Sequence, residues 1–230
     1  MHITGLQKLT LLDFPERIAC TVFISGCNLR CPFCHNASLV VTNSQETHIS
    51  EDELISFLQS RRGLLDGVCI TGGEPTIYGD ELKALIQKIR GLGFAVKLDT
   101  NGTNPSLLAE LINEGLLDYV AMDIKNSPEN YTKTCGGIDV LAKVQASVKI
   151  LMNSDVEFEF RTTVCHPLHT TEDIRQIGAW LKGTPKYFIQ QFVDSGNLIG
   201  SGMTPLSESE MEEMRQAVLP WIPNAQVRGI

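Results

Sequence analysis

The sequence lacks any uninterrupted apolar run long enough to cross a membrane or to serve as a secretory signal. Its opening, MHITGLQKLTLLDFPERIAC, is broken by charged residues, whereas a membrane-spanning helix needs about 20 consecutive apolar residues. It also lacks any basic cluster larger than Arg61 and Arg62, and its formal net charge is -8 at pH 7. Nucleic-acid-binding proteins usually present a basic patch. We therefore expect a cytoplasmic protein with neither a membrane nor a nucleic-acid partner.

Cysteines that could pair in disulfides are also scarce. The chain has 7 cysteines, an odd number, and Cys20, Cys69, Cys135 and Cys165 are scattered singly. Without a secretory signal, reduced thiols are the expected form. The chain has no low-complexity tract, no internal repeat and no linker rich in proline or glycine. We expect an ordinary globular protein with one domain.

Apolar runs rich in β-branched residues alternate along the chain with segments of helical periodicity. The runs are 18–24, 67–72, 94–100, 119–125, 158–164 and 187–192. Buried strands that alternate with helices predict an α/β fold with a parallel sheet, either doubly wound or an open barrel. These βα units fall short of a full (β/α)8 barrel, so we predict a partial (β/α)6 barrel. The expected domain comprises an N-terminal hairpin extension at 1–17, the partial barrel at 18–205, and a C-terminal helix and tail at 206–230.

The unusual residues lie where the predicted strands end, which is where α/β folds carry their functional groups. SGCNLRCPFCHN follows the first run, TGGEP the second, DTNG the third and DIK the fourth, and Arg161 lies within the fifth. Parallel strand ends meet at one rim of the sheet. We therefore interpret these segments as one functional site.

Cys27, Cys31 and Cys34 follow the spacing C-x3-C-x2-C. Thiolates are soft ligands suited to iron–sulfur clusters or zinc. Structural zinc normally takes a complete set of tetrahedral ligands. His35 could complete such a set, although the chain has no second short pair of ligands. Three thiolates alone leave one coordination position of a metal centre open.

The other strand-end residues each have a structural alternative. Gly72 and Gly73 let a ligand approach the backbone, and the Glu74 carboxylate can pair with an ammonium group, but TGGEP is also a common tight turn. Asn101 lies in an Asn-Gly turn sequence, and Asp123 and Lys125 could form an internal ion pair. Arg161 lies in an apolar run, so it should meet a carboxylate of the protein or of a cofactor.

Taken together, these motifs resemble the radical S-adenosylmethionine (radical SAM) superfamily. The resemblance rests on C-x3-C-x2-C with Phe33 before the last cysteine, and on the Gly-Gly-Glu-Pro strand end. It implies one [4Fe-4S] cluster on the three cysteines, with the open iron chelated by the amino and carboxylate groups of S-adenosylmethionine. It also implies that Gly72, Gly73 and Glu74 bind the methionine amino group and that Phe33 packs near the cluster and the adenine.

Within that superfamily, Cys34-His35-Asn36, DTNG and DIK resemble the glycyl-radical-enzyme activating enzymes. The segment LTLLDFPERIACTVFISGCNLRCPFCHN looks like the activating proteins of anaerobic ribonucleoside-triphosphate reductases, and the likeness extends to about Phe192. Similarity to pyruvate formate-lyase activase implies that Asp99, Thr100 and Asp123 surround a monovalent cation beside the cofactor carboxylate, and that Lys125 and the His35 segment line the same pocket. The implied cofactor-binding set is Phe33, His35, Asn36, Gly72, Gly73, Glu74, Asp99, Thr100, Asn101, Asp123, Lys125 and Arg161.

The resemblance implies a reaction as well. A donor such as flavodoxin or ferredoxin reduces the cluster, S-adenosylmethionine is split, and the resulting 5′-deoxyadenosyl radical removes a hydrogen atom from a glycine of a partner enzyme. Gln190 or Gln191 stands where pyruvate formate-lyase activase carries a late histidine. Two alternatives stay open at this point: a radical SAM enzyme that acts on a small molecule, and a zinc-stabilised binding module.

Overall fold

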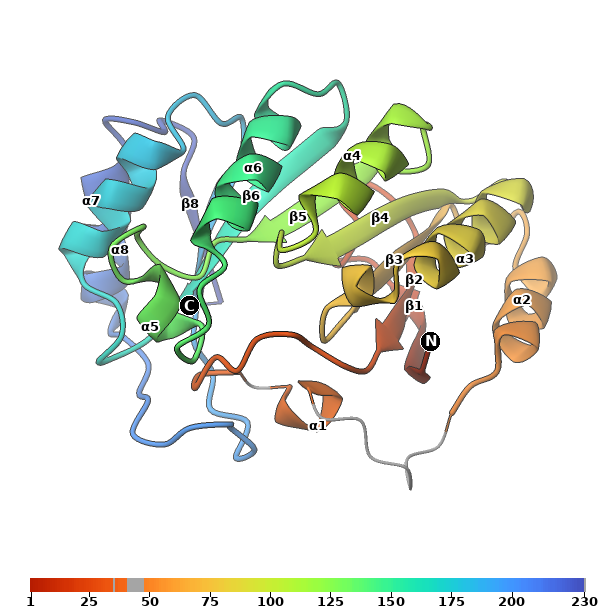
Figure 1. The fold of residues 1–230 in the computed structure, drawn as a ribbon, viewed down its shortest axis with the longest axis horizontal. Coiled ribbons are helices and arrows are strands. Elements are labelled where there is room, and N and C mark those ends of the chain that lie inside the picture. Colours follow the sequence, from red (N-terminus) through yellow and green to blue (C-terminus); the bar gives the residue numbers. More distant parts are fainter. Residues whose placement is uncertain (35, 41–47, 230) are drawn as a thin grey trace.

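The computed structural model describes residues 1–34, 36–40 and 48–229. Its centre is one eight-stranded sheet in which the strands follow one another in sequence order (Figure 1). The strands are β1 (Ile3–Thr10), β2 (Ala19–Ile24), β3 (Gly67–Gly72), β4 (Ala95–Thr100), β5 (Tyr119–Asp123), β6 (Glu157–Val164), β7 (Tyr187–Gln191) and β8 (Gln226–Arg228). The helices are α1 (Ala37–Val40), α2 (Glu51–Ser60), the 3-10 helix η1 (Pro75–Tyr78), α3 (Asp80–Gly91), α4 (Pro105–Asn113), α5 (Tyr131–Thr134), α6 (Leu141–Met152), α7 (Thr171–Trp180) and α8 (Glu208–Val218).

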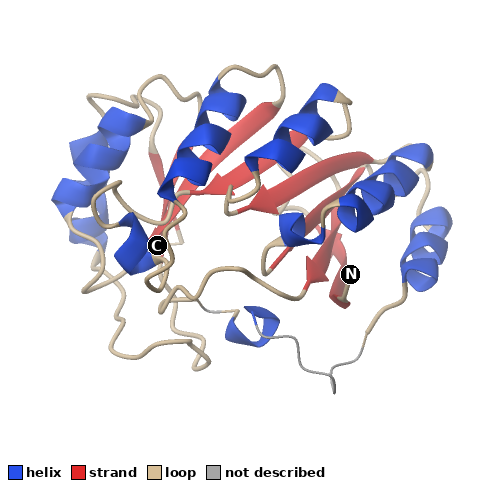
Figure 2. Cartoon of the chain, in the orientation of Figure 1, coloured by secondary structure: helices blue, strands red, loops and turns tan. Residues whose placement is uncertain are grey.

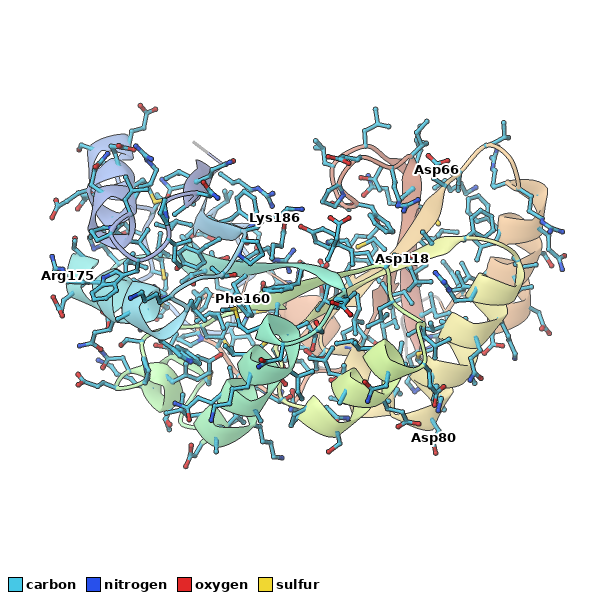
Figure 3. All side chains as sticks on the ribbon, turned by 90° about the horizontal axis from the view of Figure 1, so that it is seen from above. Asp66, Asp80, Asp118, Phe160, Arg175 and Lys186 are labelled. Atoms are coloured by element: carbon cyan, nitrogen blue, oxygen red, sulfur yellow. The ribbon has the colours of Figure 1, made fainter. Side chains whose placement is uncertain are left out.

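Strands β2 to β8 run parallel, and β1 pairs antiparallel with β2. Figure 2 shows the helices gathered along one side of the sheet, and Figure 3 shows the sheet as an arc with helices along its outer side. No pairing in the described part of the chain joins β1 to β8. The predicted α/β fold with an open, mostly parallel sheet is therefore confirmed.

The alternation of side chains along each strand separates the core from the inner face of the arc. On β4, Val96 and Leu98 are fully buried on the helix side, while Lys97 and Asp99 project from the opposite face. On β2, Val22 packs in the core and Thr21 projects toward the inside of the arc. Because every central strand repeats this pattern, the polar residues collect inside the arc.

Both ends of the chain add a strand to the sheet. The N-terminal extension at 1–17 contains strand β1, which pairs antiparallel with β2. The C-terminal tail adds strand β8 beside β7. Arg228 on β8 holds it in place through an ion pair with Glu159. A three-residue strand has too little periodicity to be recognised in a sequence.

Capping explains where the regular helices begin. Ser50 caps α2, and Glu53 returns the hydrogen bond to the Ser50 backbone, which makes a capping box. Thr170 with Asp173 and Ser207 with Glu210 form the same arrangement at α7 and α8. No helix in the described ranges is long and apolar enough to span a membrane.

Candidate active site

A pocket of about 340 Å³ opens on the inner face of the sheet, with residues from every strand from β1 to β7 in its wall. Most of the residues expected at the site meet there. Those that line it are Cys27, Cys31, Phe33, Cys34, Asn36, Gly72, Gly73, Asp99, Thr100, Asn101, Asp123, Lys125 and Arg161. Glu74 is not part of this wall, and His35 lies outside the described residues.

The three cysteines reach the pocket from the loop that follows β2. A turn closed by the Cys34 N–H and the Cys31 carbonyl, at 3.1 Å, brings the second and third cysteine to the same side. Burial raises the pKa of Cys27 to about 11, whereas hydrogen bonding with the neighbouring Cys135 thiol lowers the pKa of Cys31 to about 7. A lowered pKa favours the thiolate, which is the form of cysteine that binds a metal.

Hydrogen-bond donors surround the Cys27 sulfur. The Leu29 backbone N–H lies 3.4 Å from Cys27 Sγ, and the Asn101 side-chain amide lies 4.0 Å from it. Asn101 Nδ2 also donates to Asn28 Oδ1 at 3.0 Å, so the turn after β4 is tied to the cysteine loop. Donors of this kind stabilise the anionic sulfur of a ligating thiolate. Asn28 had no recognisable signal in the sequence.

The described residues contain no group of three or more His, Cys, Asp or Glu side chains close enough to hold a metal ion. A cubane cluster binds each thiolate through a different iron, so its ligands need not converge on one point. Metal sites also commonly take their final geometry only when the metal binds. Three thiols on one pocket wall, one of them with a lowered pKa, fit such a cluster as donors.

The two glycines of TGGEP are required by close backbone packing. A β-carbon on Gly72 would lie 2.2 Å from the Ile24 carbonyl oxygen, and φ at this glycine is +125°. A β-carbon on Gly73 would lie 2.1 Å from the Gly26 carbonyl oxygen. The end of β3 therefore packs directly against the start of the cysteine loop, and its backbone faces the pocket.

Glu74 is completely buried beside this pocket. Its Oε1 accepts hydrogen bonds from the Thr76 hydroxyl at 2.5 Å, the Thr76 N–H at 3.0 Å and the Thr100 hydroxyl at 2.8 Å. Its Oε2 accepts one from the Asn101 N–H at 2.5 Å. Burial raises the pKa of Glu74 despite these bonds. In this structure the carboxylate joins the end of β3 to the end of β4, and its expected contact with an amino group stays a prediction.

Arg161 meets two carboxylates of the protein. Its Nε donates to Asp123 Oδ1 at 2.9 Å, and its Nη1 lies 3.2 Å from Asp99 Oδ2. Lys125 Nζ pairs with Asp123 Oδ2 at 2.9 Å, and Lys97 Nζ with Asp99 Oδ1 at 2.5 Å. We call these five side chains, Lys97, Asp99, Arg161, Asp123 and Lys125, the charge network.

The charge network keeps both of its carboxylates ionised. Burial acts to raise the pKa of Asp99, but Arg161 and Lys97 outweigh it and the pKa is lowered. The pKa of Asp123 is lowered as well, because Arg161 and Lys125 again outweigh burial. Lys97 was not predicted as a site residue. The signal was available, since it alternates with Asp99 inside an apolar strand.

Phe33 is nearly fully buried and packs edge-on against the His169 ring, with centroids 5.7 Å apart. His169 Nε2 contacts the Lys125 carbonyl oxygen at 2.8 Å.

The two glutamines near the end of β7 have different roles. Gln190 lines the pocket, whereas Gln191 bonds to the backbone of Leu206. Gln7, Asp13 and Thr163 also line the pocket and were not predicted.

Comparison with known proteins identifies the family of this chain. A family model described as the radical SAM superfamily matches residues 21–181. This range includes the cysteine loop, the turns after β3 and β4, and the charge network. The chain belongs to the radical SAM superfamily. This membership implies a [4Fe-4S] cluster and S-adenosylmethionine as cofactors, and it makes the chain an enzyme.

Among curated relatives, a Methanocaldococcus jannaschii protein provisionally named a glycyl-radical enzyme activating enzyme is 31% identical over 235 residues, covering 99% of this chain and 96% of its own length. A 7-carboxy-7-deazaguanine synthase from Thermococcus kodakarensis is 28% identical over 187 residues, covering 74% of this chain and 72% of its own length. The relative with the activating-enzyme name is therefore similar over a larger part of the chain.

Solved radical SAM structures share the fold. A radical SAM methyltransferase from Sphaerobacter thermophilus superposes with a TM-score of 0.71 at 15% identity, over 96% of this chain and 68% of that one. The Streptococcus suis protein SuiB, solved with its precursor peptide SuiA, gives a TM-score of 0.70 at 14% identity, over 91% of this chain and 48% of that one. At these identities the likeness establishes the fold alone.

Proposed function

We propose that this protein is a glycyl-radical enzyme activase, which removes a hydrogen atom from a glycine of a partner enzyme. The observation that carries the proposal is the similarity to an activating enzyme along nearly the whole chain, including the segments that flank the radical SAM match. A second protein of that name, from Haemophilus influenzae, is 25% identical over 195 residues. The activase motifs Cys34-His35-Asn36, DTNG and DIK support the same reading.

The residues of the pocket fit the two cofactors. Cys27, Cys31 and Cys34 would hold a single [4Fe-4S] cluster, which supplies the electron that cleaves S-adenosylmethionine. The backbone of Gly72 and Gly73 would approach the methionine amino group, and Arg161 and Lys125 would face its carboxylate. Phe33, which belongs to the cysteine loop and is buried against the His169 ring, would exclude water from this side. Holding the reacting groups rigidly in place can lower the activation free energy of such reactions by a large part.

We further propose that the partner is the anaerobic ribonucleoside-triphosphate reductase of the same organism, and that a flavodoxin or ferredoxin supplies the electron in the cytoplasm. The support is the resemblance of the segment 9–36 to activating proteins of that reductase. The monovalent cation that the resemblance implies beside Asp99, Thr100 and Asp123 is a separate question, because both carboxylates already pair with cations of the chain.

The surface beside the pocket supports a protein substrate. Gln7 and Asp13 line the pocket, and the hairpin connection between them exposes Leu9 by 57%, Leu11 by 68% and Leu12 by 90%. Thr10 holds this connection in shape by accepting hydrogen bonds from the backbone of residues 12 and 13. Exposed apolar side chains grouped in this way are one mark of a protein–protein contact surface.

The similarity to a 7-carboxy-7-deazaguanine synthase favours a second candidate, a radical SAM enzyme that acts on a small purine-like molecule. Such an enzyme would share every cofactor-binding residue. The two candidates differ in where the hydrogen atom comes from, since an activase takes it from a protein. The zinc-stabilised module is not supported, because the chain belongs to an enzyme superfamily.

The deciding experiment mixes the anaerobically reconstituted protein, S-adenosylmethionine, a one-electron reductant and the reductase. An activase should place a glycyl radical on the reductase, seen by electron paramagnetic resonance, with 5′-deoxyadenosine formed in proportion. The protein with Cys31→Ala, which removes the thiol with the lowered pKa, is the negative control, and Cys20→Ala, buried outside the pocket, is the matched positive control. A radical on another glycyl radical enzyme would overturn only the choice of partner. No radical on any of them would overturn the activase proposal.

A further inference from the structure

The two carboxylates expected to surround a monovalent cation already form ion pairs with cationic side chains of the chain. Asp99 contacts Lys97 and Arg161, and Asp123 contacts Arg161 and Lys125. The charge network therefore sets three cationic side chains against two carboxylates. Two of these cations, Arg161 and Lys125, line the pocket wall where an anionic carboxylate of S-adenosylmethionine would bind. An added metal ion would have to share oxygens that already accept hydrogen bonds.

Lys97 differs from the other two cations of the network in its position. Arg161 and Lys125 line the pocket, whereas Lys97 does not and is only 2% exposed. Its Nζ lies 2.5 Å from Asp99 Oδ1, 3.8 Å from Cys69 Sγ and 5.9 Å from the centre of the Tyr119 ring. No ligand in the pocket can replace these contacts. Lys97 therefore stays with Asp99 when Arg161 and Lys125 turn to a ligand.

We propose that Lys97 takes the place of a monovalent metal ion in this protein. Its ammonium group, which lies outside the pocket wall, neutralises Asp99. Arg161 and Lys125 are then free to bind the carboxylate of S-adenosylmethionine. Lys97 is thus a positioning residue, since it acts through Asp99 and touches no cofactor. The proposal rests on S-adenosylmethionine as cofactor and is independent of which partner is activated.

The physical reason is the cost of a buried carboxylate without a counter-charge. Removing one partner of a buried ion pair leaves an uncompensated charge that the protein must neutralise in another way. With Lys97 uncharged, the network would hold two cations and two carboxylates, and Asp99 would compete with the cofactor carboxylate for Arg161. A small cation from solution could then bind where the ammonium was. A metal-ion requirement should therefore arise in the variant and be absent from the natural protein.

The test measures the affinity of the reconstituted protein for S-adenosylmethionine in buffers of equal ionic strength whose only cation is tetramethylammonium, sodium or potassium. The natural protein should show the same affinity in all three within about twofold, because its counter-charge is built in. Lys97→Met should bind about tenfold more weakly in tetramethylammonium and recover in sodium or potassium. Lys83→Met, which removes a helix-surface lysine paired with Glu110 and Glu114, is the matched control and should behave as the natural protein.

A second readout needs no cofactor. The melting temperature of the cluster-free natural protein should be the same in the three salts, whereas that of Lys97→Met should rise with sodium or potassium, since a ligand that binds only the folded state stabilises it. Metal-ion-dependent affinity or stability of the natural protein would overturn the proposal, and this arm decides even if the variant fails to fold. Full affinity of a folded Lys97→Met in tetramethylammonium would overturn it as well. Failure to bind S-adenosylmethionine in any salt would instead contradict the cofactor assignment.

Discussion

Gly73 lies so close to Gly26 that a β-carbon on Gly73 would come within 2.1 Å of the Gly26 carbonyl oxygen. The contact joins the end of β3 to the loop that carries the three cysteines, and the Glu74 N–H donates to the same oxygen at 2.8 Å. Any side chain at position 73 must push the cysteine loop away. The Gly-Gly sequence is thus a packing requirement of the site as well as a surface for the cofactor.

Replacing Gly73 with alanine should therefore lower both stability and iron content. Overpacking of this kind typically costs about 1–3 kcal/mol, and the displaced loop should bind less iron after anaerobic reconstitution. Gly91→Ala is the matched control, because that glycine ends helix α3 and a β-carbon there meets nothing within 4 Å. Thermal melting and iron analysis of both variants check the prediction. A Gly73→Ala protein with the natural iron content would contradict it.

Glu74→Gln should destabilise the protein even without any cofactor. The carboxylate accepts four hydrogen bonds from protein donors, and the amide nitrogen of glutamine would face at least one of those donors. A buried donor or acceptor left without its partner costs about 1–3 kcal/mol. The measurement is the free energy of unfolding of the cluster-free protein.

Glu110→Gln provides the control for this change. Glu110 forms an exposed ion pair with Lys83, and pairs of that kind contribute at most about 1 kcal/mol. The affinity for S-adenosylmethionine should fall with Glu74→Gln as well, because the ends of β3 and β4 would no longer be tied together. Unchanged stability with weaker cofactor binding would instead show that Glu74 contacts the cofactor directly.

Much of the fold could be predicted from the sequence, because its strands are rich in β-branched residues and its helices show a periodic spacing of apolar residues. The predicted run 67–72 coincides with β3, and 158–164 differs from β6 by one residue at its start. The clustering of the strand-end segments also followed from topology, since parallel strands bring their ends to one rim. The sequence could not reveal the contacts between side chains that lie far apart in the chain and meet only in the folded structure.

Glu74 and Lys97 illustrate that limit. Glu74 is expected to contact a ligand, and the sequence did not reveal that the turn after β3 also places its carboxylate under the end of β4, where Thr100 and Asn101 donate to it. Lys97 was not predicted, although its alternation with Asp99 places both side chains on one face of the strand; what the sequence does not show is which neighbouring strand covers it. Its contact with Asp99 is local, but its burial depends on Tyr119 of the next strand.

The exposed leucines of the β1–β2 connection should matter only when a protein substrate is present. Replacing Leu11 and Leu12 together with serine should leave melting temperature, iron content and S-adenosylmethionine affinity unchanged, because these side chains are 68% and 90% exposed. The yield of glycyl radical on the partner should fall several-fold, since truncating apolar contact residues commonly costs about 1 kcal/mol or more each at an interface. Val193→Ser, 66% exposed on another loop, is the control. Equal radical yields from all three proteins would exclude the connection as a contact surface.

Acid should destabilise the protein through His169, which is 2% exposed. Its Nδ1 accepts a hydrogen bond from the Cys165 N–H at 3.2 Å, and its Nε2 donates to the Lys125 carbonyl oxygen at 2.8 Å. This arrangement requires a neutral ring, and burial lowers the pKa of His169 below its ordinary value. The unfolded chain therefore binds a proton at a higher pH than the folded chain does. Unfolding stability should fall as pH drops below about 6.5, the ordinary histidine value, and continue to fall down to the pKa of the folded state.

The measurement is the free energy of unfolding of the cluster-free protein by denaturant between pH 5 and pH 8, a range that contains the ordinary histidine pKa of about 6.5. His169→Gln should have a flatter pH profile than the natural protein over this range, because it removes the group that must stay neutral. His2→Gln, which changes an exposed histidine, should keep the natural slope. Protonation of His169 in the folded protein would also disturb the Phe33 ring that packs against it, so binding of S-adenosylmethionine should weaken only at the lower pH at which the folded protein itself takes up this proton. A natural protein whose stability is constant from pH 8 to pH 5 would contradict the prediction, and a His169→Gln variant with an undiminished slope would show that another group governs the response.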